Sequence, residues 1–234
     1  YLPYERPPLS KEAITGKKNF EELSFFSKSF YDVENINIKY QAVEKVNFEK
    51  KILITKDNQN HSYDSLLIAT GSKNRQLSYD KENQDIKDSI LYLRNIEDSK
   101  KIKNIIESHD KFAIIGGGFI GLEIASSISQ LSKTAHVIEM GPKVMGRIIP
   151  SQIASMVSKY HENRGNSIFV NSNILSIKKI GSEYQIELNN NKKILVDFII
   201  AGIGSFANVG LFENTSLKLD NGIVTDEFCR TSEK

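Results

Sequence analysis

The sequence contains a single cysteine, Cys229, and no tryptophan. One thiol cannot form a disulfide within the chain, and it cannot supply a multi-cysteine zinc site. The four histidines are scattered without the spacing of metal ligands, so we expect no metal site. Chains without paired cysteines are typical of a reducing compartment, and we expect a cytoplasmic protein in which Cys229 is an ordinary strand residue.

The chain has no large excess of basic or acidic residues, and it has no long apolar run. Its 31 basic and 29 acidic residues give a formal net charge of +2 in 234 residues. Nucleic-acid affinity depends largely on basic residues that neutralise phosphates, so this balance argues against a nucleic-acid partner. The longest apolar candidate, residues 112–125, is interrupted by four glycines and Glu123. It is shorter than the roughly 18–20 residues that span a membrane, so we expect no membrane partner either.

Hydrophobic periodicity predicts short β-strands early in the chain, followed by strands that alternate with helices. Residues 11–31 are loosely helical and polar, and residues 36–40, 41–48 and 51–55 have β-like patterns. A short buried strand is expected next at residues 66–69, and a polar connector follows it at residues 72–88. The remaining pattern predicts helices at 96–110, 119–131 and 149–163, strands at 112–115, 135–139, 167–170, 174–180, 184–188, 193–196 and 198–201, and one more strand near a turn at 220–222.

Two segments of the chain are similar to each other. Residues 64–72 and 197–205 align without a gap, and a Lys-Lys-Ile-Leu segment precedes each. We interpret them as two copies of one supersecondary unit, with two unrelated β-hairpins as the alternative. The glycine-rich loop that starts at Gly116 lies 88 residues before Gly204, so the corresponding loop of the first copy would precede Tyr1. We therefore expect the sequence to be a fragment.

The segment Gly116-Gly-Gly118-Phe-Ile-Gly121 has the spacing of a dinucleotide-binding loop. It follows an apolar strand and opens an apolar helix, and the next strand ends at Glu139, 23 residues after Gly116. Gly116 permits a tight turn, Gly118 leaves room for a pyrophosphate, and Gly121 lets helix and strand approach each other. Backbone N–H groups at the helix start would then meet the phosphates. The alternative is a glycine-rich turn that serves packing alone.

Two carboxylates near this loop have candidate roles. Glu139 would accept hydrogen bonds from a ribose diol and repel a 2′-phosphate, which favours NADH over NADPH. Lys143 and Arg147 lie close enough in sequence to weaken that exclusion. Glu123 would either contact the nicotinamide or only gain roughly 0.3–1 kcal/mol from the helix dipole.

Two further features are consistent with a cofactor site. Thr70-Gly71 and Gly202-Ile-Gly204 follow predicted strands, where the backbone can pass close to a cofactor or simply turn. Arg6 and Lys11 flank the rigid segment Pro-Pro-Leu-Ser and could hold an anionic ring system. Taken alone, that segment is better explained as a solvated basic loop.

In chain order, these motifs resemble those of the FAD-dependent NAD(P)H reductases of ferredoxin, rubredoxin and putidaredoxin. These enzymes belong to the pyridine nucleotide–disulfide oxidoreductase superfamily, which also includes apoptosis-inducing factor. The Arg-Pro-Pro-Leu-Ser-Lys element is fairly specific to the ferredoxin-reductase branch, and the other motifs are shared more widely. The segments that carry the resemblance are 3–11, 64–71, 116–123, 137–139, 144–147, 202–204, 221–226 and 230–232.

The resemblance implies positions for both cofactors. Lys11 would lie near the reactive nitrogen of the flavin, and Lys11 and Glu123 would be the catalytic residues. The FAD contacts would be Arg6, Pro8, Lys11, Val43, Ala69, Thr70, Gly71 and Arg75. The NADH contacts would be Gly116, Gly118, Phe119, Ile120, Gly121, Glu123, Glu139, Arg147 and Gly204, with NADPH less favoured.

The implied fold is α/β, with a Rossmann-like NAD-binding domain inserted in a partial FAD-binding domain of the same type. The FAD part would be residues 1–88, the NAD part 89–215 and the return segment 216–234. The family's amino-terminal FAD loop, its later Gly-Asp motif and its interface domain lie outside this sequence. We therefore expect the fragment alone to bind FAD weakly and to be inactive. The segment 204–208 also lacks a proline that is usual in the family.

The implied activity is hydride transfer from NADH to FAD, followed by electron transfer to a small iron–sulfur protein such as a ferredoxin or rubredoxin-like protein. One alternative is another flavoenzyme of the superfamily, such as an NADH oxidase or a nitrite or disulfide reductase. The lack of cysteine in residues 1–90 argues against the thiol-using branches. The other alternative is a non-enzymatic, NADH-sensing flavoprotein like apoptosis-inducing factor.

Overall fold

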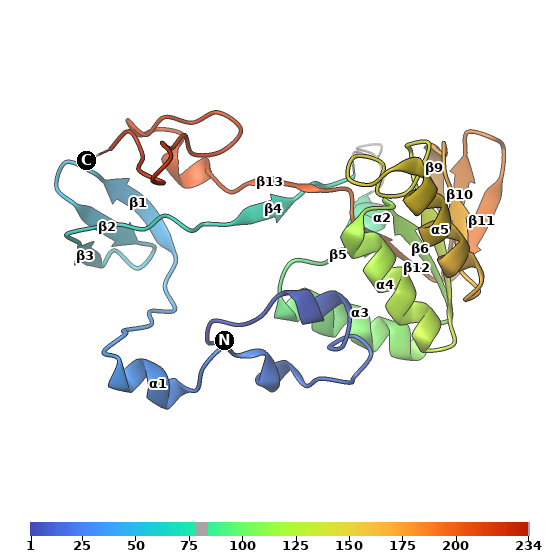
Figure 1. Ribbon diagram of the computed structural model, residues 1–234, viewed down its shortest axis with the longest axis horizontal. Helices are drawn as coiled ribbons and strands as arrows, with labels where there is room; N and C mark the ends of the chain where they lie inside the picture. Colours follow the sequence, from blue (N-terminus) through green and yellow to red (C-terminus); the bar gives the residue numbers. More distant parts are fainter. Residues whose placement is uncertain (78–83, 234) are drawn as a thin grey trace. The chain divides into compact units, whose positions relative to one another are not determined.

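A computed structural model describes residues 1–77 and 84–233, which form two compact units (Figure 1). The first unit contains Tyr1–Phe25 and Asn74–Gly204, and the second contains Phe26–Lys73 and Ser205–Lys234. These limits differ from the expected functional domains because the first 25 residues pack with the larger unit. The assignment of cofactors to the domains stays a prediction.

Five parallel strands form the centre of the first unit (Figure 1). In spatial order they are β5 (Ile90–Tyr92), β12 (Phe198–Ala201), β6 (Lys111–Ile115), β7 (Thr134–Ile138) and β8 (Ser167–Phe169). The chain leaves β6 toward β7 on one side and later returns to β12 on the other, so the strand order reverses between β6 and β12. In open α/β sheets, ligands bind at such a reversal, outside the carboxyl ends of the strands.

Both faces of this sheet are covered, which explains why its strands are apolar throughout. Phe112 and Ile114 of β6 pack into the core on the helical face, and the alternate residues Ala113 and Ile115 pack into the core on the opposite face. The helical face carries α3 (Ile96–Ser108), α4 (Phe119–Gln130) and α5 (Ser151–Glu162). The opposite face carries α2 (Gln84–Ser89) and an antiparallel sheet of β9 (Ile174–Ile180), β10 (Glu183–Leu188) and β11 (Lys193–Val196).

The amino-terminal segment adds apolar side chains to the helical face of the first unit. Leu9, Ala13, Ile14 and Leu23 are all buried in that core. The segment consists of turns and the two 3₁₀-helices η1 (Pro7–Ser10) and η2 (Phe20–Leu23), so the loose helix expected over residues 11–31 is largely wrong. Gly16, at a φ of +73°, has a backbone conformation that an α-helix does not contain.

The second unit is built from short strands (Figure 1). The strands β1 (Val43–Asn47), β2 (Ile52–Thr55) and β3 (Asn60–Ser62) form an antiparallel sheet. In addition, β4 (Ser72–Asn74) pairs with β13 (Ser205–Ala207). The remaining regular elements among the described residues are α1 (Lys28–Val33) and η3 (Gly210–Phe212).

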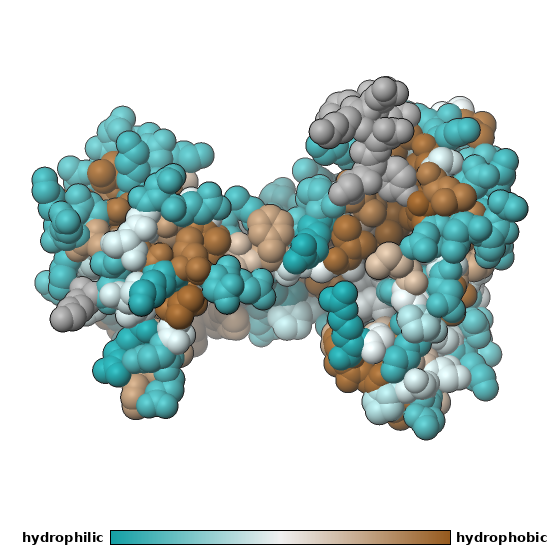
Figure 2. Space-filling view, turned by 90° about the horizontal axis from the view of Figure 1, so that it is seen from above, coloured by the Kyte–Doolittle hydropathy of each residue, from teal (hydrophilic) through white to brown (hydrophobic). Residues whose placement is uncertain are grey.

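Several elements predicted for the second unit are absent from the described residues. Residues 36–40 and 66–69 form no strand, and none follows β13. Leu67 is 88% exposed, so the segment expected to be a buried strand is not buried, and Figure 2 shows apolar side chains at the surface of this unit. An apolar run becomes a strand only when a neighbouring strand pairs with its backbone groups. Cys229 lies in a turn at a φ of +59°, not in a strand.

The predicted internal repeat is only partly present in the structure. Each copy contains a three-stranded antiparallel meander, β1–β3 in the first and β9–β11 in the second. The Lys-Lys-Ile-Leu segments occupy different places, because one enters the middle strand β2 and the other lies in the outer strand β11. The aligned segment that follows is a strand only in the second copy, as β12.

The end of α5 is joined to the sheet through a buried histidine. His161 is 5% exposed, and its Nδ1 lies 3.3 Å from Nδ2 of Asn166. Asn166 also donates to the carbonyl of Ala125 and accepts from the N–H of Ala135. Burial, and then the nearby Arg164, lower the pKa of His161 below its ordinary value of 6.5.

We expect this histidine to make the protein less stable in acid. Below about pH 6.5 the unfolded chain binds a proton at His161 that the folded chain resists, so the free energy of unfolding falls as the pH falls. Burial lowers the pKa of His136 as well, so this histidine also makes the free energy of unfolding fall as the pH falls. Urea denaturation at pH 7 and pH 5.5 should show a smaller loss of stability in His161→Gln than in the wild type. Equal losses would contradict this explanation.

Candidate functional site

A tight glycine turn joins β6 to α4 at the point where the strand order reverses. Gly116 has a φ of +103°, and a Cβ at this position would lie 2.5 Å from the carbonyl oxygen of Gly202, which follows β12. A Cβ at Gly121 would lie 2.1 Å from the carbonyl oxygen of Gly116. The tight turn and the close helix–strand approach predicted from the glycine spacing are therefore present.

The start of α4 has room for a ligand. Gly118 is the N-cap residue, and in the described structure no atom lies within 4 Å of a Cβ built on it. No side chain of the described residues caps this helix end. The exposed fractions of Phe119 and Ile120, in the first turn, are 52% and 44%. An anion could therefore approach the first N–H groups of α4, where the helix dipole favours negative charge.

Glu139 follows β7 beside the glycine turn, and the backbone holds its carboxylate. Its Oε2 accepts a hydrogen bond of 2.7 Å from the N–H of Gly117, and its Oε1 accepts one of 2.7 Å from the N–H of Gly141. A carboxylate oxygen can accept more than one hydrogen bond. Each oxygen therefore keeps capacity to accept a bond from a ligand hydroxyl.

The loop after Glu139 contains the two predicted basic neighbours. Lys143 donates from Nζ to the carbonyl oxygen of Ile149 at 2.8 Å, so its ammonium group already has a partner. Arg147 is exposed. The N–H of Met145 donates to the carbonyl of Gly117 at 2.8 Å, which fixes this loop to the glycine turn.

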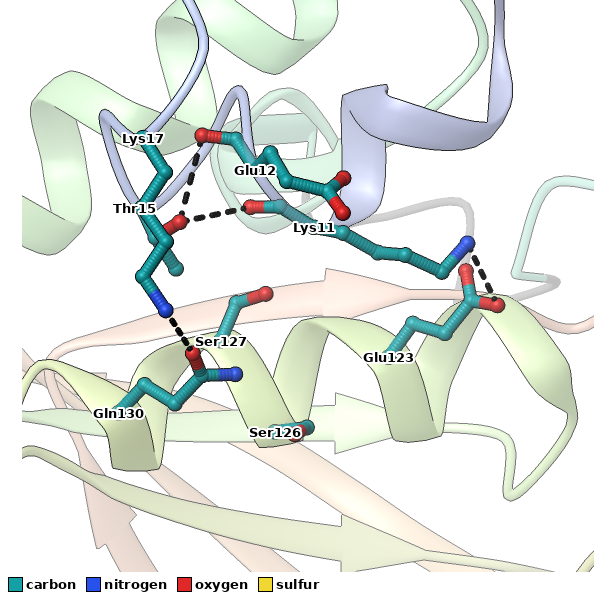
Figure 3. A pocket seen from close by; sticks show the side chains of 8 residues that line it. All are labelled: Lys11, Glu12, Thr15, Lys17, Glu123, Ser126, Ser127 and Gln130. Carbon is teal, nitrogen blue, oxygen red and sulfur yellow. Dashed lines mark hydrogen bonds and ion pairs between the residues drawn. The ribbon is translucent and has the colours of Figure 1, made fainter.

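Lys11 and Glu123 form an ion pair in the first unit, as Figure 3 shows. Nζ of Lys11 lies 3.0 Å from Oε1 of Glu123 and also donates to the carbonyl of Pro7 at 3.1 Å. Ser10 donates from Oγ to the other carboxylate oxygen at 2.5 Å. The pair lies in a pocket between the amino-terminal segment and α4, lined by Lys11, Glu12, Thr15, Lys17, Glu123, Ser126, Ser127 and Gln130.

Two fully buried serines fix the η1 turn against the helices. Ser99 of α3 donates to the carbonyl of Leu9 at 2.7 Å, and Ser127 of α4 donates to the carbonyl of Ser10 at 2.8 Å. Neither of these two serines nor Ser10 was predicted as a site residue from the sequence. Ser127 lies four residues after Glu123 and therefore on the same helix face, a signal that could have identified it. Ser99 has no comparable signal.

The other predicted flavin neighbours in this segment differ in exposure. Arg6 is exposed, whereas Pro8 is buried in η1. Arg94, which was not predicted as a site residue, interacts electrostatically with Arg6. Burial, and then the Arg6 guanidinium, lower the pKa of Arg94. Arg75 donates from its N–H to the carbonyl of Gly204 at 2.9 Å, so these two predicted cofactor residues are neighbours.

The remaining predicted FAD residues belong to the second unit. Val43 begins β1, and Ala69, Thr70 and Gly71 are exposed. Thr70 donates from Oγ1 to the carbonyl of Asn208 at 2.8 Å, and the N–H of Asn208 donates to the carbonyl of Gly71 at 2.9 Å. Asn208 therefore holds the Ala-Thr-Gly segment, although the neighbouring proline expected from the family is missing.

With this geometry established, comparison with known proteins identifies the family. All of residues 1–234 match the family model described as pyridine nucleotide-disulphide oxidoreductase. The chain belongs to this family. Within the family, it is 33% identical over 233 residues to a rubredoxin-NAD(+) reductase of Pseudomonas putida, covering 99% of this chain and 60% of that protein. It is 31% identical over 234 residues to the 3-phenylpropionate/cinnamic acid dioxygenase ferredoxin–NAD(+) reductase component of Photorhabdus laumondii, covering 100% of this chain and 58% of that protein.

Solved structures of this family agree with the fold. A ferredoxin reductase from Rhodopseudomonas palustris gives a TM-score of 0.93 at 26% identity, covering 100% of this chain and 57% of that one. A covalent putidaredoxin reductase–putidaredoxin complex gives 0.91 at 26% identity, with the same coverage. The predicted family and α/β fold are thereby confirmed. The chain spans about three fifths of the length of these relatives.

The described residues contain neither a membrane-spanning helix nor a cluster of metal-ligating side chains. None of their helices has the length and apolarity that crossing a membrane requires. Nor do residues 1–77 and 84–233 contain a group of three or more His, Cys, Asp or Glu side chains suited to a metal ion.

Proposed function

We propose that the protein is a flavoprotein reductase that passes a hydride from NADH to FAD and then electrons to a small iron–sulfur protein. The observation that carries the proposal is the geometry at the strand-order reversal. There the glycine turn leaves an open helix start at Gly118, and Glu139 holds a fixed carboxylate at the end of the next strand. The names of the relatives, which are rubredoxin-NAD(+) and ferredoxin–NAD(+) reductases, support the choice of donor and acceptor.

In this proposal, the first turn of α4 binds the pyrophosphate of NADH through the N–H groups around Gly118, Phe119 and Ile120. Glu139 accepts hydrogen bonds from the hydroxyls of the adenosine ribose. Glu123 lies on the next turn of α4, so the coenzyme would extend along the helix toward the Lys11–Glu123 pair. The remaining proposed NADH contacts are Gly116, Gly121, Arg147 and Gly204.

The open cradle at Gly118 and the cations near η1 fit the two cofactors that the proposal requires. FAD, when bound, supplies a ring that accepts two electrons and returns them singly. Lys11 would place a positive charge beside the reduced ring. Glu123 and the carbonyl of Pro7 hold that ammonium group, and Ser10 in turn donates to the Glu123 carboxylate. The proposed FAD contacts, in addition to Lys11, are Arg6, Pro8, Val43, Ala69, Thr70, Gly71 and Arg75.

Anaerobic stopped-flow spectroscopy of the FAD-loaded protein tests the proposal. NADH should remove the absorbance of the oxidised flavin rapidly, and a ferredoxin or rubredoxin should then be reduced. In a parallel aerobic assay with an oxygen electrode, rapid oxygen consumption without reduction of the iron–sulfur protein would favour an NADH oxidase instead. A long-lived complex with NADH that transfers no electrons would favour a sensor, and a protein that binds no NADH would refute the proposal.

Replacing Glu139 with arginine should change the preferred coenzyme from NADH to NADPH. The substitution removes the acceptor of the ribose hydroxyls and adds a donor for a 2′-phosphate, so the ratio of the two affinities should change by about 10- to 100-fold. Titration of both coenzymes measures that ratio. Glu162→Arg, the same charge change at the exposed carboxyl end of α5, is the control and should leave the ratio unchanged. An unaltered ratio in Glu139→Arg would contradict the ribose assignment.

A further inference from the structure

Two glycines that are not among the three defining glycines of the GxGxxG motif, Gly117 and Gly141, hold the Glu139 carboxylate. Gly117 donates to Oε2 and Gly141 donates to Oε1, each at 2.7 Å. Gly117 also accepts the N–H of Met145, so the glycine turn and the loop after β7 are bonded on both sides of the carboxylate. The two donors come from different loops, and together they restrict the rotation of the carboxylate plane.

At both positions a side chain would make tight contacts with its surroundings, so a neighbouring atom would have to shift. A Cβ at Gly141 would lie 3.0 Å from Oε1 of Glu139. A Cβ at Gly117 would lie 3.2 Å from Oε2 and 3.1 Å from Cγ1 of Val144, which is fully buried. Neither glycine has a positive φ, so a substitution acts through these contacts and not through backbone strain.

We infer that Gly141 is a positioning residue for coenzyme selectivity, because its missing Cβ allows the N–H to fix the Glu139 carboxylate. This inference rests on the proposed function. With both N–H donors in place, the Glu139 carboxylate has one orientation. Each of its oxygens can then accept one further hydrogen bond, and the two oxygens together suit a pair of ribose hydroxyls. A methyl group at residue 141 would push Oε1 away by a few tenths of an ångström and weaken its bond with the Gly141 N–H. The carboxylate then bonds the diol of NADH less well, while its charge, which opposes a 2′-phosphate, is unchanged.

Calorimetric titration of the purified protein with NADH and NADPH tests this inference without turnover. Gly141→Ala should weaken NADH binding about tenfold and leave NADPH binding within about twofold, so that selectivity falls about tenfold. Gly118→Ala is the matched control, since a methyl group at the phosphate approach should weaken both coenzymes alike. A Gly141→Ala protein that keeps the wild-type ratio would overturn the inference.

Two further variants keep the test decisive. Glu139→Asp retains the charge, but its shorter side chain cannot reach both N–H groups, so it should lose selectivity even if Gly141→Ala does not fold. In a Glu139→Ala background, Gly141→Ala should not change the ratio further, because the two residues act through one contact. An Asp variant with wild-type selectivity, or additive effects in the double variant, would contradict the inference. A wild-type protein that binds neither coenzyme would refute the proposed function itself.

Discussion

Gly118→Ala is expected to reduce NADH affinity more than 100-fold while the protein stays folded. The new methyl group would meet no described protein atom within 4 Å, and the backbone at this residue, with a φ of −82°, accepts alanine. Stability should therefore fall by no more than about 1 kcal/mol, the usual cost of alanine at a helix N-cap. In the complex, however, the methyl group would occupy the space through which the pyrophosphate reaches the amides of α4. Each lost charge-assisted hydrogen bond is worth about 1.5–3 kcal/mol.

The matched control is the same substitution three residues later. In Gly121→Ala, the methyl group would lie 2.1 Å from the carbonyl oxygen of Gly116 and 3.2 Å from Cγ2 of Ile114. Because helix and strand must separate, we expect a loss of at least about 1–3 kcal/mol in the free energy of unfolding. Calorimetry and urea denaturation on both variants separate the two effects. Wild-type NADH affinity in Gly118→Ala would show that the pyrophosphate binds elsewhere.

Lys11→Met is expected to slow the reduction of the flavin by NADH about 100-fold. Methionine keeps most of the length and apolar contact of the lysine stem but removes the charge that Glu123 and the reduced ring would share. Loss of one preorganised electrostatic contact typically costs a factor of about 100–1,000 in rate. NADH affinity should change by less than about tenfold, because the phosphate and ribose contacts remain. Single-turnover stopped-flow spectroscopy at saturating NADH measures the reduction step directly.

Lys17 offers a control within the same pocket. Its Nζ donates to Oε1 of Gln130 at 2.7 Å, whereas the ion pair with Glu123 is made by Lys11 (Figure 3). Lys17→Met should therefore leave the rate of flavin reduction within about twofold of the wild type. Equal slowing in both variants would mean that the general positive potential matters and not the position of Lys11.

The sequence predicted the parts of the fold that depend on local pattern. The strand β6, the glycine turn, α4 and β7 are contiguous, and each step has its own signal in apolar spacing or glycine. The strands β9, β10, β11 and β12 were also predicted correctly, because neighbouring strands pair and cover them. Residues 66–69 have an equally apolar pattern but no strand partner among the described residues, and sequence alone does not show whether a partner exists.

The candidate site was predictable only in part, for the same reason. The positions of Gly116, Gly121 and Glu139 follow from spacing along one βαβ unit. The contacts that orient the site connect residues far apart in sequence, such as Ser99 to Leu9 and Asn208 to Thr70. Gly141 carries no motif, and its closeness to the Glu139 carboxylate follows from the path of the loop.

The helix α4 also sets the distance between the proposed phosphate-binding residues and Glu123. Gly118 caps its start, and Glu123 lies five residues further on, about 7.5 Å along the axis at a rise of about 1.5 Å per residue. This spacing is set by backbone hydrogen bonds and does not depend on side-chain rotamers. Insertion of a single residue between these two positions would turn Glu123 by about 100° around the helix, away from Lys11. The length of this stretch of α4 is therefore constrained even where its side chains face only solvent.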